Sequence, residues 1–207
     1  MVKFVYFDVG GVVVLDFSKT NKWDEVIEEI GVKQDKVASF LKYFEELTPK
    51  IHLGLDIDLK LDELKKRFGV KIPKDYSLLK DGFVSRFEAN KSIESVVEYV
   101  KERFKVGLLT NQYPMMLEEI IKQKLLPPVS WDVVIDSSVV KKQKPDIEIY
   151  KLAERLAKAK GQEILFVENS LEHIEGAKKL NWKTFLYDPA NPEKSSEKLL
   201  EYIKDIT

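Results

Sequence analysis

The sequence has no cysteine and only two histidines in 207 residues. The absence of cysteine excludes disulfide bonds, thiolate catalysis and metal sites built on cysteine. The scarcity of histidine nearly excludes a metal site made of several imidazoles. A chain without cysteine also fits a reducing compartment, so we expect a cytoplasmic protein.

An excess of charge of one sign and long apolar runs are missing as well. Lysine and arginine total 34 and aspartate and glutamate total 35, which gives a formal net charge of −1. Without a basic stripe, the composition is not that of a general nucleic-acid binder. No apolar run approaches the roughly 20 residues of a membrane span, and the first residues lack a signal-peptide layout. We therefore expect neither a nucleic-acid partner nor a membrane partner.

The composition is that of a folded globular protein. Hydrophobic residues make up 44% of the chain and charged residues 33%, which is ordinary for such proteins. The length suffices for one well-buried core with a small inserted subdomain. The oligomeric state stays open between a monomer and a homodimer.

Short apolar runs typical of strands alternate with helical patterns over most of the chain. Strands that alternate with helices of about 10–15 residues indicate βαβ units and a parallel sheet with right-handed crossovers. We therefore predict an α/β fold, a Rossmann-like, doubly wound parallel sheet. The expected strands are residues 4–8, 106–110, 133–136, 164–168 and 184–187, and the expected helices are 92–104, 114–124, 147–159, 171–180 and 193–206.

The stretch from Asp16 to Arg86 interrupts this alternation and is mostly helical in pattern. We expect helices at 22–30, 36–46 and 59–68 within it. The simplest interpretation is an α-helical cap inserted after the first strand, which would act as a lid that keeps water from the chemistry. The predicted domains are therefore a core of residues 1–15 and 87–207 and a cap of residues 16–86.

The first expected strand ends in a lone carboxylate that is followed by glycines. Asp8 would lie at the edge where open α/β sheets bind their ligands. Gly10 and Gly11 allow backbone N–H groups, those of Val9 and Gly10 among them, to approach an anion closely. A carboxylate held against a phosphate is a potential nucleophile, so the pattern indicates phosphoryl chemistry. The alternative is an ordinary strand-ending Asp-x-Gly turn.

Polar residues follow other strands of the same expected sheet. Thr110 and Asn111 end the second strand with a hydroxyl and backbone amides, and Glu168 and Asn169 end the fourth with an acidic and polar cluster. Lys144 precedes a helix and supplies a cation. A carboxylate, a hydroxyl, an ammonium and an acidic corner for Mg²⁺ together make a phosphoryl-transfer site.

These four segments resemble the motifs of the haloacid dehalogenase (HAD) superfamily, and the resemblance covers nearly the whole chain. The branch most similar in appearance is that of small-capped sugar-phosphate phosphatases. The resemblance implies a Mg²⁺-dependent phosphomonoesterase that acts on a small phosphorylated metabolite through an aspartyl-phosphate. It implies that Asp8 and Lys144 are catalytic, that Val9, Gly10, Thr110, Asn111 and Lys144 bind phosphate, and that Asp8, Gly10, Asn169 and Glu168 hold the metal.

Two departures from the family pattern bear on catalysis. Gly10 stands where the family usually has a second aspartate, which protonates the leaving group and then activates water, and losing such assistance typically costs ~10²–10⁴ in rate. Glu168-Asn169 replaces an acidic pair, so Mg²⁺ should bind more weakly than usual. Asp16 is a conceivable substitute for the missing acid; the alternative is a solvated hinge residue.

The departures leave two hypotheses open, an active phosphatase and a catalytically impaired HAD-fold protein that binds a phosphorylated ligand or regulates a partner. Dehalogenation is disfavoured, because that branch typically carries a tyrosine at the Gly10 position and an arginine in the early cap, and residues 16–51 contain no arginine. For His173 we expect a solvated or helix-capping role, and for His52 a surface or hinge role.

Overall fold

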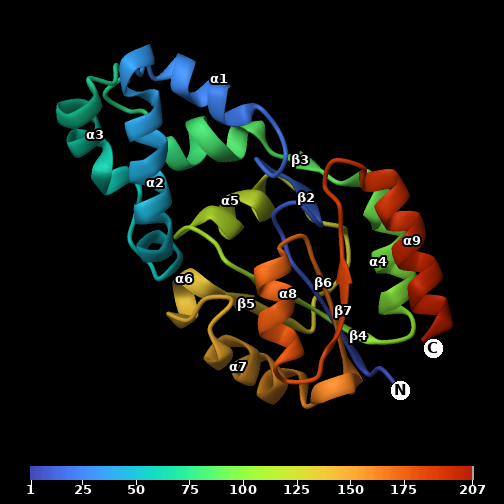
Figure 1. The fold of residues 1–207 in the computed structure, drawn as a ribbon. Coiled ribbons are helices and arrows are strands. Elements are labelled where there is room, and N and C mark those ends of the chain that lie inside the picture. Colours follow the sequence, from blue (N-terminus) through green and yellow to red (C-terminus); the bar gives the residue numbers. More distant parts are fainter. Residues whose placement is uncertain (207) are drawn as a thin grey trace.

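A computed structural model describes residues 1–206 of the chain. All neighbouring strands of its main sheet run parallel, in the order β5-β4-β1-β6-β7, which places β1 at the centre (Figure 1). The predicted α/β fold with a parallel sheet is therefore confirmed. The strands are β1 (Phe4–Phe7), β4 (Lys105–Thr110), β5 (Val133–Asp136), β6 (Ile164–Glu168) and β7 (Lys183–Leu186).

Helices cover both faces of this sheet. The α4 and α9 helices pack together on one face, and α7 and α8 pack together on the other (Figure 1). Two shorter helices, α5 and α6, follow the second and third strands of the main sheet. The bounds are α4 (Lys91–Lys101), α5 (Met116–Lys122), α6 (Ser137–Val140), α7 (Ile147–Ala157), α8 (Leu171–Lys178) and α9 (Pro192–Asp205).

The central strand β1 is buried on both sides. Phe4 and Tyr6 belong to the apolar cluster beneath α7 and α8, whereas Val5 and Phe7 belong to the cluster beneath α4 and α9. This alternation follows from the two-residue period of a strand. None of the four side chains is more than 1% exposed, and burial of this apolar area fixes the end of the strand, where Asp8 follows.

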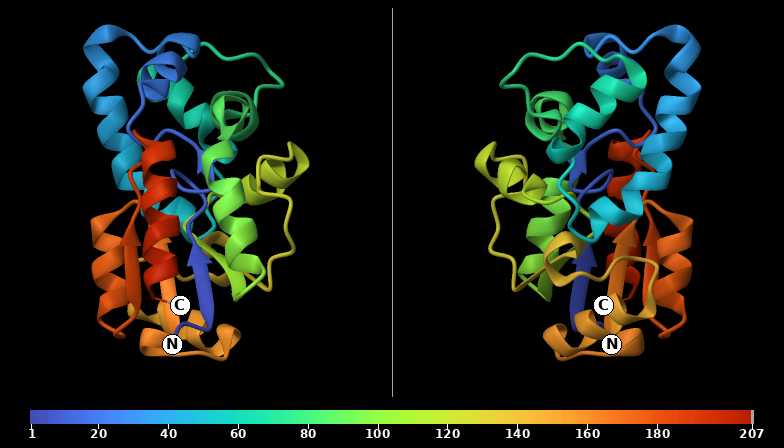
Figure 2. Two further views of the ribbon diagram at one scale, coloured as in Figure 1. Left: turned by 90° about the vertical axis from the view of Figure 1, so that its right-hand side faces the viewer. Right: turned by 90° about the vertical axis from the view of Figure 1, so that its left-hand side faces the viewer.

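The expected helical insertion lies between two short strands that pair with each other. Strand β2 (Val14–Leu15) is antiparallel to β3 (Glu88–Ala89). The intervening helices lie beyond the ends to which the strands of the main sheet point (Figure 2). They are α1 (Lys22–Glu29), α2 (Val37–His52), α3 (Leu61–Phe68), a π-helical segment (Leu78–Phe83) and 3₁₀ turns at Gln34–Lys36, Asp58–Lys60 and Val84–Arg86.

The expected helix that ends at Glu46 continues to His52. Pro49 lies inside the observed helix, although proline lacks an N–H group and crowds the preceding turn. In the structure Leu47 and Ile51 are buried in the core of the insertion, and this packing carries the helix past the proline. The extension matters because it delivers His52 to the site described below.

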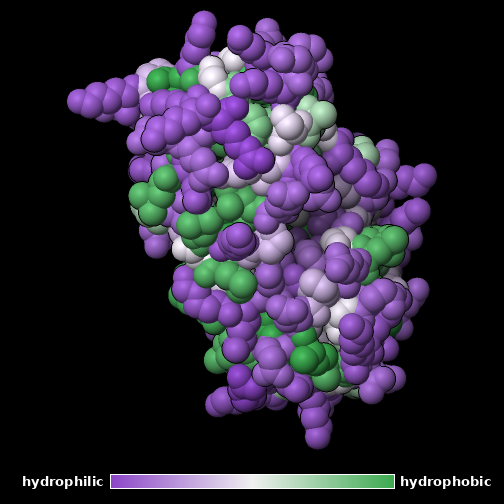
Figure 3. Space-filling view, turned by 60° about the vertical axis from the view of Figure 1, so that its left-hand side comes forward, coloured by the Kyte–Doolittle hydropathy of each residue, from purple (hydrophilic) through white to green (hydrophobic). Residues whose placement is uncertain are grey.

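The molecular surface in Figure 3 is mostly hydrophilic, with small, separate apolar patches. Exposed large apolar side chains include Leu59, Val139 and Leu171, which belong to different elements. Such scattered exposure is ordinary for a folded protein. Within residues 1–206, none of the helices has both the length and the apolar character needed to cross a membrane.

We expect the Asn90→Ala variant to have a free energy of unfolding lower by about 2–3 kcal/mol. The Asn90 side chain is 1% exposed. It caps α4 by accepting a hydrogen bond from Ser92 N at 3.2 Å, and it donates to Val12 O at 2.7 Å. Urea denaturation measures the change, and exposed Lys91→Ala at the same helix end should lose less than about 0.5 kcal/mol. Equal losses in the two variants would contradict this assignment.

Candidate active site

A buried lysine lies between two buried carboxylates at the carboxyl edge of the sheet. The Lys144 Nζ atom lies 2.9 Å from Asp8 Oδ1 and 2.6 Å from Glu168 Oε2. Asp8 follows β1 and Glu168 ends the neighbouring strand β6, so parallel pairing brings their carboxylates to one edge. The structure thus brings these three residues together, as the sequence indicates, although their chemical roles stay predictions.

Lys144 is held in place through its backbone as well as its ammonium group. Its Nζ also donates to Leu109 O at 3.0 Å. The Asn111 side chain accepts from Lys144 N at 2.9 Å and donates to Lys144 O at 2.9 Å. These paired bonds attach the segment before α7 to the end of β4, so Asn111 positions the lysine.

Glu168 is fully occupied by donors from the protein. Its Oε1 accepts from Asn169 N at 2.9 Å and Ser170 N at 3.0 Å, while His173 Nδ1 lies 3.1 Å from Oε2, the oxygen that Lys144 contacts. Burial acts to raise the pKa of Glu168, but Lys144 and His173 outweigh burial and lower the pKa to about 2. The carboxylate is therefore ionised and acts as the fixed counter-ion of Lys144.

Asp8 is in the opposite electrostatic situation. Burial and the nearby charge of Glu168 raise its pKa to about 6, although Lys144 acts to lower it. Asp8 Oδ1 is buried and makes no hydrogen bond within the described residues, because the 2.9 Å ion pair with Lys144 lacks hydrogen-bond alignment. Because Lys144 is shared with Glu168, the negative charge of Asp8 is only partly compensated, and a bound cation or an electrophile would compensate it further.

The turn after Asp8 forms a close-fitting backbone cradle. Gly11 has φ 73°, a left-handed conformation that favours glycine. A Cβ atom on Gly11 would collide with the Asn169 side-chain amide and approach Ser18 Oγ to 2.9 Å. Asn169 Nδ2 itself donates to Ser18 Oγ at 3.2 Å. Gly11 is therefore required by space as well as by backbone conformation.

The two polar residues expected at the end of β4 differ in their placement. Thr110 is completely buried, and its hydroxyl accepts from Gln112 Nε2 at 3.0 Å. Asn111 and Gln112 line the cavity beside Asp8, whereas Thr110 is not among the described lining residues. The predicted phosphate-binding role of Thr110 stays a prediction, and Gln112 is a candidate that the sequence reasoning missed.

The residues near Asp8 fit Mg²⁺ by the kind of donor atom that they offer, but they supply little negative charge. The unbonded Asp8 Oδ1, the Gly10 carbonyl and the Asn169 side-chain carbonyl are all oxygen donors, the kind of ligand that Mg²⁺ prefers. Both Glu168 oxygens already accept from the protein. No group of three or more acidic or histidine side chains suited to a metal occurs within residues 1–206, so the donor set carries one available carboxylate and should bind Mg²⁺ weakly.

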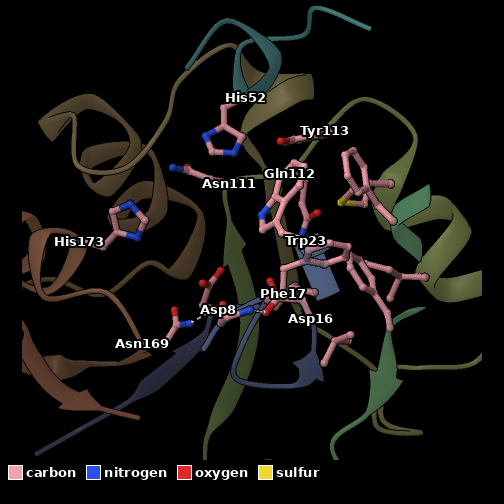
Figure 4. A pocket seen from close by; sticks show the side chains of 18 residues that line it. Asp8, Asp16, Phe17, Trp23, His52, Asn111, Gln112, Tyr113, Asn169 and His173 are labelled. Atoms are coloured by element: carbon pink, nitrogen blue, oxygen red, sulfur yellow. Dashed lines mark hydrogen bonds between the residues drawn. The ribbon is translucent and has the colours of Figure 1, made fainter. Parts of the chain in front are cut away.

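A cavity of about 300 Å³ opens beside Asp8, between the sheet edge and the helical insertion (Figure 4). Its inner end is polar, with Asp8, Asn111 and Asn169. Its remaining wall is largely aromatic and apolar, and none of the described lining residues is lysine or arginine. The apolar part of the wall includes Val14, Phe17, Trp23, Phe83, Phe87, Met116 and Ile120.

Several cavity residues come from the insertion or its junction with the sheet. Asp16 and His52 both line the cavity, and so does His173, on α8 (Figure 4). Burial, followed by the charges of Lys144 and His173, lowers the pKa of His52 to about 4, so His52 is neutral at pH 7. The surface or hinge role expected for His52 and the solvated or helix-capping role expected for His173 stay predictions. Their placement on the cavity was not expected, because periodicity alone does not show which helix faces meet there.

The family model of haloacid dehalogenase-like hydrolases matches residues 2–181. A comparison with curated protein sequences gives no match.

Three solved structures share the fold at low sequence identity. A predicted HAD-like family hydrolase from Porphyromonas gingivalis is 19% identical, with a TM-score of 0.76 over 100% of this chain and 98% of that one. A HAD family enzyme from Bacteroides thetaiotaomicron, in complex with magnesium and inorganic phosphate, is 17% identical, with a TM-score of 0.71 over 90% and 94%. A 2-haloacid dehalogenase from Pseudomonas syringae pv. Tomato is 15% identical, with a TM-score of 0.63 over 100% of each chain.

We expect Asp8→Asn to stabilise the metal-free protein by about 1–3 kcal/mol near pH 7.5, with little difference near pH 4. The pKa of Asp8 is raised to about 6 by burial, so the folded state holds this proton more tightly than the unfolded state. The stability contributed by the protonated group is present below about pH 4 and is lost as the pH rises through about 6. Urea denaturation in EDTA at both pH values measures the difference.

Asp132→Asn is the matched control of opposite sign. Burial acts to raise the pKa of Asp132, but hydrogen bonds from Lys101 and Val106 N lower it overall. Its ionised form therefore stabilises the fold, and the variant should be less stable than the wild type near pH 7.5. Destabilisation by Asp8→Asn at that pH would contradict the electrostatic account of Asp8.

Proposed function

The chain belongs to the haloacid dehalogenase-like hydrolase family, and on that premise we propose that it is a Mg²⁺-dependent phosphomonoesterase that acts on a small phosphorylated metabolite. The single observation that supports this most is Asp8 Oδ1, a buried carboxylate oxygen with no hydrogen bond that lies 2.9 Å from Lys144 Nζ at the end of an open cavity. This arrangement suits a nucleophile that needs one free lone pair and a fixed orientation.

In the proposed reaction Asp8 attacks phosphorus and becomes an aspartyl-phosphate, which water then hydrolyses. Lys144 holds Asp8 in place and provides positive charge beside the transferring group. The proposed donors to the phosphate oxygens are backbone N–H groups, those of Val9, Gly10 and Asn111. Thr110 lies deeper, where its hydroxyl supports Gln112.

Magnesium would be held by the carboxylate of Asp8, the carbonyl of Gly10 and the side chain of Asn169. The ion would supply positive charge against the phosphate oxygens. Glu168 would not contact the ion directly, since its oxygens already accept from Lys144, Asn169 N and Ser170 N. With one carboxylate available, half-saturation should need a higher Mg²⁺ concentration than a site with two carboxylates.

We further propose that residues 16–86 form a cap domain over a core of residues 1–15 and 87–207. In this proposal the cap selects the leaving group of the substrate. Phe17, Trp23 and Phe83 pack edge to face around the cavity, with ring centroids 5.4–5.5 Å apart. A wall of this kind favours a substrate with an apolar or aromatic leaving group over a sugar phosphate.

Two other functions are weighed against this proposal. A catalytically impaired, ligand-binding protein is favoured by Gly10, which lacks the usual carboxylate. Dehalogenation also uses a carboxylate nucleophile, but no arginine lines the described cavity, where a halide would need a cation.

The wild type should hydrolyse para-nitrophenyl phosphate only when Mg²⁺ is added, and Asp8→Asn should lower kcat at least about 10³-fold, because no other carboxylate lies at that position. Phosphate release is measured over a panel of aryl, alkyl, nucleoside and sugar phosphates. Aryl phosphates should have the highest kcat/KM. Asp35→Asn, which removes an exposed carboxylate in the insertion, should leave the rates unchanged.

Two outcomes would reject this function. Release of chloride from 2-chloropropionate without any phosphatase activity would indicate a dehalogenase. Folded wild-type protein that is stabilised against heat by inorganic phosphate, but turns over no ester in the panel, would indicate a binding protein.

A further inference from the structure

Gly10 leaves an empty position in the active-site turn, and a side chain from elsewhere in the sequence occupies it. A Cβ atom built on Gly10 would lie 3.2 Å from Asp16 Cγ and 4.0 Å from Asp16 Cβ, with Asp16 Oδ2 nearer still. In an aspartate, the two bonds from Cβ to a carboxylate oxygen span roughly 2.4 Å, given standard C–C and C=O lengths. Asp16 Oδ2 lies at that same distance from the Gly10 Cβ position.

Asp16 therefore brings a carboxylate oxygen as close to the Gly10 Cβ position as an aspartate at position 10 would bring its own. The carboxylate comes from the segment that follows β2. Gly10 and Asp16 both line the cavity that Asp8 also lines (Figure 4). The absence of a side chain at Gly10 is what makes this approach possible, because any Cβ there would collide with Asp16.

Asp16 Oδ2 is the carboxylate oxygen that lies next to the Gly10 position in the turn after Asp8. Its other oxygen, Oδ1, accepts from Ser18 N at 2.8 Å and orders the chain as it enters the insertion. The neighbouring cation Lys22 pairs with Glu88 at 3.1 Å, and Asp16 forms no ion pair with any residue in the described part of the chain. Phe17 and Trp23 provide apolar walls beside it, which disfavour a bare negative charge.

We propose that Asp16 is the general acid and base of this site and replaces the carboxylate that Gly10 lacks. The proposal rests on the phosphomonoesterase function proposed above. As an oxygen of Asp8 bonds to phosphorus, the bond from phosphorus to the ester oxygen breaks and that oxygen takes the proton of Asp16. Water then attacks phosphorus and returns a proton to Asp16, while Asp8 leaves as a carboxylate and inorganic phosphate is released.

A leaving-group comparison separates this role from a structural one. Asp16→Asn should lower kcat for an alkyl phosphate about 10²–10⁴-fold, because an alkoxide needs a proton as it leaves. The same variant should lose less than about tenfold with para-nitrophenyl phosphate, whose leaving group departs without one. A purely structural role would lower both rates equally. Asp35→Asn serves again as the exposed control.

A positional exchange provides the second test. Gly10→Asp/Asp16→Ala restores a carboxylate on the turn after Asp8, so it should recover at least about tenfold of the alkyl-phosphatase activity lost in Asp16→Ala. Gly10→Asn/Asp16→Ala has the same shape without an acid and should recover none. Thermal stabilisation by inorganic phosphate with Mg²⁺ shows that each variant folds and binds.

The outcomes distinguish this proposal from the function on which it rests. Asp8-dependent turnover of both esters, unaffected by Asp16→Asn, overturns the role of Asp16 and leaves the phosphatase intact. Equal recovery by the Asp and Asn exchanges also overturns it, since shape alone would then suffice. Failure of the wild type to hydrolyse any ester overturns both proposals together.

Discussion

The structure depends on one buried ammonium group shared by two buried carboxylates. Lys144 contacts Asp8 and Glu168, which come from adjacent strands, and its own backbone is tied to Asn111 at the end of a third. Removing Lys144 would leave two buried carboxylates without their cation, and a loss of this kind typically destabilises a protein by about 3–5 kcal/mol. The carboxyl ends of β1, β4 and β6 are therefore held together by electrostatics as well as by packing.

One positive charge does not balance two negative charges, and the imbalance falls on Asp8. Glu168 has four protein donors or contacts and stays ionised, whereas Asp8 has a raised pKa and an oxygen without a hydrogen bond. A site in this condition gains from a second cation or from an electron-poor phosphorus atom. The reactivity proposed for Asp8 thus follows from how its neighbours divide the charge of Lys144.

Much of this arrangement could be predicted from the sequence, because it follows from parallel strands. Residues directly after apolar runs gather at one edge, so Asp8, Glu168 and Lys144 were expected together, as was the helical insertion. The positions of Asp16, His52 and His173 depend instead on turn geometry and on which helix faces meet. A single sequence specifies neither, and the continuation of α2 through Pro49 arises only from its packing in the core of the insertion.

The β2–β3 pair has a consequence for how such a chain can change over evolutionary time. Leu15 lies opposite Glu88, so the chain leaves the sheet layer and returns to it at nearly the same point. Any segment with closely spaced ends, down to a tight hairpin turn, fits this junction without rethreading the sheet. Recombination could therefore exchange the aromatic wall that the insertion supplies. Asp16 lies directly next to the junction, and an exchange that preserved the proposed chemistry would have to retain it.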